Sequence, residues 1–379
     1  MAHVVVCGGG FGGLPAASRL RELLDPSDTV TVIAADDRFF MGFAKLWALS
    51  GQRPLADGTR SLARLEERGI RFVHDTIEAI DPSEVAVETS GGGFDADGIV
   101  VALGAAPPPR HRELLAVDDA YHLYDGRTID EVRRRITDVT TGTIAVAILG
   151  GPFKCPPAPY EAALVVDELL RERGVRNDVD VVVATPQPLT VPAAGVDASQ
   201  FVASFLAERG VEVLTEHRVS DVSPGQLSFA DHEPLAFDLL LGVPADHPLD
   251  VIAESALSDD DGWIRPDPAT FATDFDRVYA IGDCTVVPTA SGALPHAGVF
   301  AAGGGRVAAA NLAADLQGGP SVQFDGSGYC FLELPGEQVA FVEGNFYADP
   351  PDVSLSEPSH RLFQRKREYE TSHLERWLP

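Results

Sequence analysis

The chain has 379 residues, 45% of them hydrophobic and 23% charged, a composition typical of a globular protein with room for two or three buried cores. Its 57 acidic residues outnumber its 29 basic ones, and the formal net charge of -28 argues against nucleic acid or anionic lipid headgroups as partners. No apolar run approaches the roughly 20 residues that span a bilayer, and Met1 leads directly into an apolar strand without a basic leader, so we expect a cytoplasmic protein.

The first predicted strand, His3–Cys7, runs into a glycine-rich turn and then into a helix. The glycines fit the spacing G-x-G-x-x-G, which is typical of a dinucleotide site when a strand precedes it and a helix follows. In that motif Gly8 permits the tight turn, Gly10 lets the backbone approach a pyrophosphate, and Gly13 lets helix and strand pack closely. The residues expected to bind the dinucleotide here are Gly8, Gly10, Phe11, Gly12 and Gly13.

Two further strands complete the predicted cofactor groove in this part of the chain. Strand Thr29–Ile33 is followed by Asp36, which is the candidate for the ribose contact although it stands later than the motif usually places the acid. A buried strand over 97–101 leads into a small-residue turn that contains Ala102 and Gly104. Because ligands of parallel sheets bind at the carboxyl ends of the strands, we expect this turn to line the same groove.

A later strand ends on Gly282 and Asp283, and a helix rich in small residues follows over Ala301–Leu316. At the carboxyl end of a parallel strand, the Asp283 carboxylate can accept a hydrogen bond from a ribityl hydroxyl. His296 and Ala297 precede the helix, whose amino end can stabilise negative charge on a bound cofactor, although a packing or capping role for His296 stays open. The motifs and their order resemble the two-dinucleotide-binding-domain flavoproteins, which include the pyridine nucleotide-disulfide reductases. That resemblance implies FAD as the cofactor.

A second strand, turn and helix begins at Thr143–Leu149 and continues into a predicted helix over Tyr160–Arg173. The turn reads Gly-Gly-Pro-Phe from residue 150 and therefore lacks the bare backbone that a pyrophosphate requires. The next strand, Val179–Ala184, is followed by threonine and proline and offers no acid for an NAD ribose. We therefore expect this half to be Rossmann-like in shape but to bind no NAD(P)H.

The four cysteines divide into two pairs. Cys7 and Cys284 stand at the ends of predicted strands, and we assign them a packing role. Cys155 opens a Pro-rich turn at the start of a predicted helix, where the helix dipole favours a thiolate, and Cys330 stands in an aromatic strand-like run. A buried structural role is the alternative for both. No CxxC or His/Cys cluster exists, so we expect no metal site.

Flavoproteins that replace the second glycine motif with a cysteine turn are the sulfide:quinone oxidoreductases and the flavoprotein subunit of flavocytochrome c sulfide dehydrogenase. The chain resembles them in Cys155 followed by Glu161, and in Cys330 after the small-residue helix. The resemblance implies that both thiols flank the flavin and that sulfide attacks a disulfide or polysulfide bridge between them. The released thiolate then adds to the flavin and passes on two electrons, while Glu161 shuttles the proton; a purely electrostatic role for Glu161 at the helix start is the alternative.

The chain departs from that pattern in two places. Many membrane-bound members carry a third cysteine that Gly104–Gly150 lacks, and the tail His360–Pro379 is short and charged. The apolar residues of this tail could lie on a membrane surface as a peripheral contact, but we favour a core face or a homodimer contact. The expected acceptor is a quinone or an electron-carrier protein. The alternatives are an NADH-linked flavoprotein resembling alternative NADH dehydrogenases, and a flavoprotein subunit that delivers electrons to a cytochrome.

The expected fold class is α/β, with two nested Rossmann-like domains and a carboxyl-terminal segment. Residues 1–109 and 245–319 form the discontinuous FAD-binding domain, because the first Rossmann unit returns to supply the Asp283 strand. Residues 110–244 form the second Rossmann-like domain. Residues 320–379 hold the Cys330 strand, a strand over Val339–Tyr347, a loop rich in proline and serine, and a terminal helix.

Overall fold

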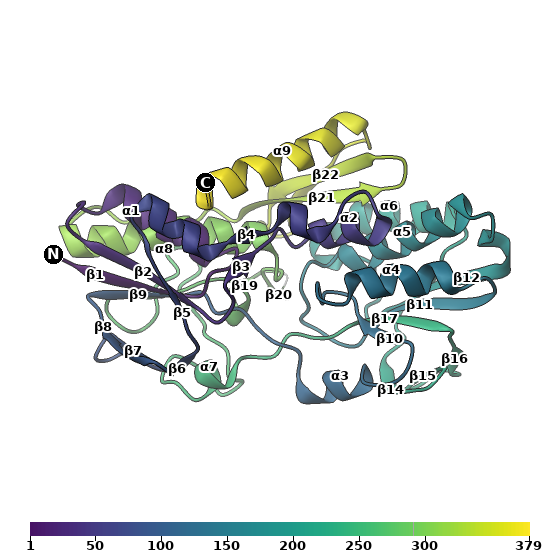
Figure 1. Cartoon of the computed structure of the whole chain (residues 1–379), viewed down its shortest axis with the longest axis horizontal. Coiled ribbons are helices and arrows are strands. Elements are labelled where there is room, and N and C mark those ends of the chain that lie inside the picture. The colour runs from purple at the N-terminus through teal and green to yellow at the C-terminus, as the bar shows by residue number, and fades with distance from the viewer. Residues whose placement is uncertain (291) are drawn as a thin grey trace.

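The computed structural model describes residues 1–290 and 292–379. Figure 1 shows two α/β units side by side, with the amino terminus at the far end of the first unit and the carboxyl-terminal helix lying over the junction between the two. This arrangement confirms the expected α/β class with two Rossmann-like sheets. None of the helices in the described part of the chain has the length and apolar character that a bilayer crossing requires.

The first unit is built on a five-stranded parallel sheet in the order β18-β9-β1-β2-β5. Its strands are β1 (His3–Cys7), β2 (Thr29–Ala34), β5 (Arg71–His74), β9 (Gly98–Val101) and β18 (Val278–Ala280). Helices α1 (Gly13–Leu23) and α8 (Gly298–Gln317) cover one face. The other face packs on the antiparallel strands β6 (Ile77–Asp81), β7 (Ala86–Thr89) and β8 (Gly92–Asp95). Because β18 follows the second unit in sequence, the chain leaves this sheet and later returns to it.

The second unit repeats the plan, with a parallel sheet in the order β10-β17-β11-β12-β13. Its strands are β10 (Ala120–His122), β11 (Gly142–Ile148), β12 (Val179–Ala184), β13 (Glu212–Leu214) and β17 (Leu239–Val243). One face carries α4 (Ile129–Asp138), α5 (Ala158–Glu172) and α6 (Gly195–Glu208). The other packs on α3 (Pro109–Leu114) and on the small sheet of β14 (Val219–Ser223), β15 (Gln226–Phe229) and β16 (Leu235–Ala236).

The carboxyl-terminal segment joins the two units. It consists of an antiparallel sheet and a helix: β21 (Ser327–Leu334), β22 (Gln338–Asn345), β23 (Asp352–Leu355) and α9 (His360–Trp377). The stripe of α9 that contains Phe363, Leu374 and Trp377 is buried against this sheet and the first unit. The tail therefore covers a core face, as we favoured. Strand β23 lies where we expected only a loop.

Short elements fill the connections between the units. Helix α2 (Ala44–Ser50) belongs to the first unit in sequence but packs on α4 and α5 of the second. The remaining elements are β3 (Arg38–Phe39), β4 (Arg60–Ser61), α7 (Asp250–Ala253), β19 (Pro288–Thr289), β20 (Gly292–Ala293) and the 3₁₀ turns η1 (Leu55–Gly58), η2 (Leu62–Arg68), η3 (Arg176–Asp178), η4 (Pro192–Ala194) and η5 (Gly282–Cys284).

Candidate active site

The glycines after β1 have two different functions in the structure. Gly8 adopts a φ of +116°, and a Cβ there would lie 2.3 Å from the Ala102 carbonyl oxygen. A Cβ on Gly13 would lie 1.8 Å from the Gly8 carbonyl oxygen, so this glycine permits the helix to pack on the strand. A Cβ on Gly10, in contrast, would meet no heavy atom within 4 Å. Gly8 and Gly13 thus serve the turn itself, whereas Gly10 keeps a stretch of backbone open to the groove.

A groove of about 520 Å³ runs along the carboxyl ends of the first sheet. It collects most of the residues predicted to bind the cofactor: Gly8, Gly10, Phe11, Gly12, Asp36, Ala102, Gly104, Gly282 and Asp283. The other predicted residues lie around it, since Gly13 packs behind the turn and His296 and Ala297 border the adjoining cavity. Among the residues that the structure describes, no donor hydrogen-bonds the Asp283 carboxylate, and burial raises its pKa.

A second cavity, of about 260 Å³, continues the groove between the two units. The two spaces share Phe11, Gly42, Lys45, Lys154, Asp283 and Gly298. Beyond these residues the cavity wall is largely apolar and aromatic, with contributions from α2, the start of α5 and strand β21. The structure therefore provides a long polar groove that opens into a more hydrophobic chamber.

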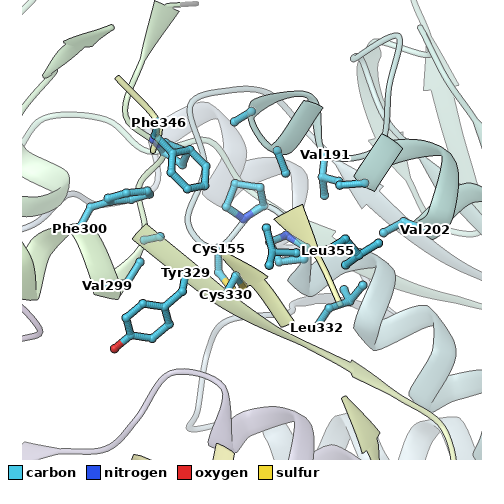
Figure 2. A pocket seen from close by; sticks show the side chains of 18 residues that line it. Cys155, Val191, Val202, Val299, Phe300, Tyr329, Cys330, Leu332, Phe346 and Leu355 are labelled. Atoms are coloured by element: carbon cyan, nitrogen blue, oxygen red, sulfur yellow. The ribbon is translucent and has the colours of Figure 1, made fainter. Parts of the chain in front are cut away.

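Cys155 and Cys330 meet at the boundary of this chamber, although they come from different parts of the chain. Cys155 stands in the turn before α5 and Cys330 stands in β21, and both are free thiols. Both also line a further cavity of about 80 Å³, which Figure 2 shows in close-up with the two cysteines close together. Cys7, at the end of β1, and Cys284, in the turn η5, are in contrast fully buried in the core on one face of the first sheet.

The turn holds Cys155 by its backbone rather than by a helix terminus. Its φ is +50°, its N–H donates to the His296 carbonyl over 2.8 Å, and its own carbonyl accepts from the N–H of Ala158 over 2.9 Å. Helix α5 begins only at Ala158, so Cys155 precedes the first turn. Burial raises the pKa of the Cys155 thiol to about 12, and the nearby Glu161 adds to this rise. Our expectation that the helix start lowers this pKa was wrong, because the cost of burying a thiolate is larger.

Glu161 lies on the first turn of α5 and is fully buried, with 3% of its surface exposed. Its carboxylate accepts the backbone N–H of Glu333 over 2.6 Å and lies 3.7 Å from the ammonium of Lys366. Burial raises its pKa to about 7, a value suited to a group that takes up and releases protons near neutral pH.

The sequence analysis missed the partners of Glu161. The Lys366 ammonium donates to Glu333 over 2.6 Å, and the indole N–H of Trp47 reaches both oxygens of the Glu333 carboxylate at 2.9 Å. All of these side chains are buried. Lys366 is one of only three lysines in the chain, and this rarity was the signal that could have drawn attention to it.

His296 is held on the other side of the Cys155 turn. Its Nδ1 lies 2.7 Å from the Asp246 carboxylate. Burial by itself lowers the pKa of His296, but the hydrogen bond with Asp246 and the negative charges of Asp283 and Asp246 together raise it. Lys154 lies 3.7 Å from the same carboxylate and donates to the Ala105 carbonyl over 2.7 Å. Asp246 and Lys154 are further site residues that the sequence patterns did not reveal.

Residues 2–304 match the pyridine nucleotide-disulphide oxidoreductase family, which is more than half of the chain. The chain belongs to this family. As a pyridine nucleotide-disulphide oxidoreductase, it is an oxidoreductase that binds a flavin.

Within this family, the chain is similar to several sulfide:quinone oxidoreductases. Over 365 residues the chain is 23% identical to the mitochondrial sulfide:quinone oxidoreductase of Mus musculus, which covers 92% of this chain and 79% of the mouse protein. It is 25% identical over 376 residues to the sulfide-quinone reductase of Aquifex aeolicus, with 92% and 84% covered. The solved structure of the sulfide:quinone oxidoreductase from Aquifex aeolicus shares the fold, with a TM-score of 0.89, 20% identity and coverage of 100% of this chain and 91% of that one. These similarities confirm the resemblance expected from the cysteine turn.

The residues present fit the flavin cofactor of this family. Gly10 and Gly104 keep open backbone toward the groove, since a Cβ on either would meet no atom within 4 Å. The Asp283 carboxylate offers an acceptor that none of the described residues occupies. The amino end of α8, at Gly298, lies where groove and chamber join and can stabilise negative charge. When bound, a flavin supplies a two-electron acceptor next to the chamber.

Proposed function

We propose that the protein is an FAD-dependent sulfide:quinone oxidoreductase that oxidises sulfide through Cys155 and Cys330. The observation that carries this proposal is the meeting of two free thiols in an apolar chamber at the end of a dinucleotide groove. The names of the similar proteins from mouse and Aquifex aeolicus support it.

The proposed cycle begins from a disulfide between the two cysteines. Hydrosulfide attacks one sulfur, so that the Cys155–Cys330 bond breaks and a persulfide bond forms on the attacked cysteine. The other cysteine leaves as a thiolate that carries the electron pair of the broken bond. This thiolate is the electron donor of the site, and the cofactor described above is its acceptor.

Glu161 is the proposed acceptor for the proton that the persulfide releases. It is buried next to both thiols, and its charge raises the pKa of each of them. With a pKa of about 7, the carboxyl can take the proton at neutral pH and pass it on. The ammonium of Lys366, 3.7 Å away, stabilises the ionised form that must exist before each transfer.

The 80 Å³ cavity offers room for the oxidised sulfur. Figure 2 shows apolar side chains around it, including Val191, Val202 and Leu355, and none of its lining residues carries a charge. A sulfur chain that grows on a cysteine is uncharged along its length. Such a chain is therefore more stable against this apolar wall than in water.

The 260 Å³ chamber suits a quinone as the final acceptor. Aromatic rings of Phe11, Phe43, Tyr329 and Tyr369 line it. Flat aromatic surfaces bind planar apolar rings by offset or edge contacts, as a quinone requires. Because quinones partition into lipid, this acceptor implies that the protein works at a membrane surface.

The test is anaerobic mixing of the flavin-loaded protein with sulfide and, separately, with NADH. We expect sulfide to bleach the flavin absorbance and NADH to leave it unchanged, because the second turn lacks the glycine spacing of a dinucleotide site and Phe153 fills it. A short-chain quinone should then restore the absorbance, and the cofactor released on denaturation should be FAD. Bleaching by NADH but not by sulfide would reverse the assignment, and reoxidation by a cytochrome but not by the quinone would make the protein an electron-delivering subunit.

A further inference from the structure

A buried cluster of three ionisable side chains borders the thiol chamber. Glu161 comes from α5, Glu333 from β21 and Lys366 from α9, and each of them is at most 6% exposed. Two carboxyl groups therefore share one ammonium in a place from which water is largely excluded. With both carboxyls ionised the cluster carries one negative charge, and with one of them protonated it is neutral. Because an uncompensated charge is costly in a buried site, this cluster is suited to hold one exchangeable proton.

The ammonium of Lys366 lies closer to one carboxylate than to the other. Its Nζ donates to Glu333 over 2.6 Å, whereas it lies 3.7 Å from the Glu161 carboxylate, which is beyond the usual length of a hydrogen bond. Glu333 is therefore the direct counter-ion of the ammonium. Glu161 is the carboxyl of the cluster that remains for the proton.

Further contacts hold the Glu333 carboxylate in this role. The indole N–H of Trp47 lies 2.9 Å from each of its oxygens, and the amide of Gln52 lies 3.5 Å from one of them. Three donors aimed at one carboxylate stabilise its ionised form. The Lys366 ammonium lies 5.1 Å from the ring centre of Phe43 and 5.8 Å from that of Trp47, so aromatic walls limit its movement.

Glu333 also contacts Glu161 directly, through its backbone. The Glu333 N–H donates to the Glu161 carboxylate over 2.6 Å, while the Glu333 side chain binds Lys366. A single residue of β21 thus fixes both the carboxyl that exchanges the proton and the positive charge nearest to it.

We propose that Glu333 is a positioning residue that holds the Lys366 ammonium away from Glu161, so that the Glu161 carboxyl stays able to exchange a proton beside the thiols. The inference rests on the proposed function, because the proton in question is the one that the persulfide releases. If Glu333 carried no charge, the ammonium would turn to the remaining carboxylate of the cluster. Glu161 would then be held in its ionised form and would be a much weaker proton acceptor.

The charges around Glu161 act in the directions that this role requires. Burial raises the pKa of Glu161 to about 7, the charge of Lys366 lowers it, and the charge of Glu333 raises it. Lys366 and Glu333 are the charged groups that act most strongly on this carboxyl. The other titratable groups that face the chamber are Lys45 on α2, Tyr124 after β10, Lys154 and Cys155 in the turn, Asp283 in η5, His296 before α8, Tyr329 and Cys330 on β21, and Tyr369 on α9.

The experiment follows the Glu161 proton by infrared spectroscopy of the flavin-loaded protein as a function of pH. The carbonyl stretch of the protonated carboxyl is assigned to Glu161 as the band that Glu161→Gln removes, and its midpoint should lie near pH 7 in the parent. In Glu333→Gln the midpoint should move at least about one pH unit lower, because a cation next to a carboxylate lowers its pKa by about one to three units. In Lys366→Met the midpoint should move about one unit higher, because the cation is lost.

Glu168→Gln is the matched control. Glu168 also lies on α5 and also accepts a backbone N–H of the β21–β22 hairpin, from Gly336 over 2.9 Å, but its side chain is only half-buried and lies outside the cluster. Its substitution should move the midpoint by less than a third of the shift in Glu333→Gln. A purely structural role for Glu333 would not give shifts of opposite sign in Glu333→Gln and Lys366→Met.

Three results would overturn the proposal: an unchanged or higher midpoint in Glu333→Gln, an equal shift in Glu168→Gln, or loss of the band in Glu333→Gln, which would make Glu333 itself the titrating carboxyl. If Glu333→Gln fails to retain flavin, Glu333→Met removes the same charge with an apolar side chain and should lower the midpoint in the same way. The infrared titration needs no sulfide. Glu333 can therefore fail as a positioning residue while sulfide oxidation stands, and the reverse.

Discussion

The two Rossmann-like units build the same strand, turn and helix and use the turn for different chemistry. In the first unit the link between β1 and α1 spans residues 8–12, and Gly10 leaves open backbone. In the second, the link between β11 and α5 spans residues 149–157, and Phe153 is buried within it. The shared topology places both turns at the carboxyl edge of a parallel sheet. The side chains in the turn then determine whether the edge of the sheet is open to a phosphate or carries a thiol.

The largest effect should come from the thiols of the second turn and of β21. Cys155→Ser and Cys330→Ser should each slow the bleaching of flavin by sulfide at least about a thousandfold, because a serine hydroxyl neither forms a disulfide nor leaves as a stable anion. Anaerobic stopped-flow absorbance measures this rate. Cys284→Ser is the matched control, since this cysteine is fully buried in the core beside the first sheet, and should leave the rate within about twofold. Parental rates in both site variants would remove the thiol mechanism.

A change at Phe153 tests why the second turn is closed. The side chain is 5% exposed and packs in the core of the second unit. Phe153→Ala should lower the free energy of unfolding by about 3 kcal/mol, the typical cost of such a cavity, as measured by denaturant titration. It should not create flavin reduction by NADH, because the turn still lacks the glycine spacing. If NADH bleached the flavin of this variant, the Phe153 ring alone would be what prevents the second turn from binding NADH.

Glu161→Gln tests proton transfer at the start of α5. Because burial raises the pKa of Glu161 to about 7, the carboxyl is mostly protonated below this pH and able to accept a proton above it. The rate of sulfide-driven bleaching should therefore rise through pH 7 in the parent protein. In Glu161→Gln this rise should vanish, and the rate at pH 8 should fall by about a hundredfold. A profile that keeps its step near pH 7 would assign the step to another group.

The smallest effect should come from adding one carbon to the open glycine of each turn. A Cβ on Gly10 or on Gly151 meets no atom of the protein within 4 Å. Gly10→Ala should weaken FAD binding about tenfold, because its Cβ would enter the groove that we propose holds the cofactor. Gly151→Ala should leave the affinity unchanged. Titration of each apoprotein variant with FAD, followed by flavin fluorescence, measures the two affinities. An equal loss of FAD affinity in both variants would show that the two turns contribute alike to cofactor binding.

The sequence was informative where local pattern determines structure. Strands β1 and β12 have the predicted bounds, because runs of valine and isoleucine between glycine and polar residues are typical of buried parallel strands. Helix α8 was placed three residues late, at Ala301 rather than Gly298, because small residues mark no clear start. Cys155 was found from its turn and Cys330 from its aromatic strand, each together with the family resemblance, and the structure brings both to one chamber.

What the sequence could not reveal depends on distant contacts. Trp47 bonds Glu333 across 286 positions, and no local pattern indicates such a pair. The pKa of Cys155 was misjudged for the same reason. The helix that follows it is visible in the sequence, but the walls that remove water from the thiol come from other parts of the chain. Burial is a property of the assembled fold.

The scarcity of lysine has a practical consequence for labelling. Because the chain has only three lysines, amine-directed reagents such as succinimidyl esters find few targets apart from the amino terminus. Lys366 is shielded, with 1% of its side chain accessible, which leaves Lys45 and Lys154 beside the chamber. An ordinary acylating dye would therefore report on occupancy of the groove and of the chamber proposed for the quinone, without engineering a handle into the protein.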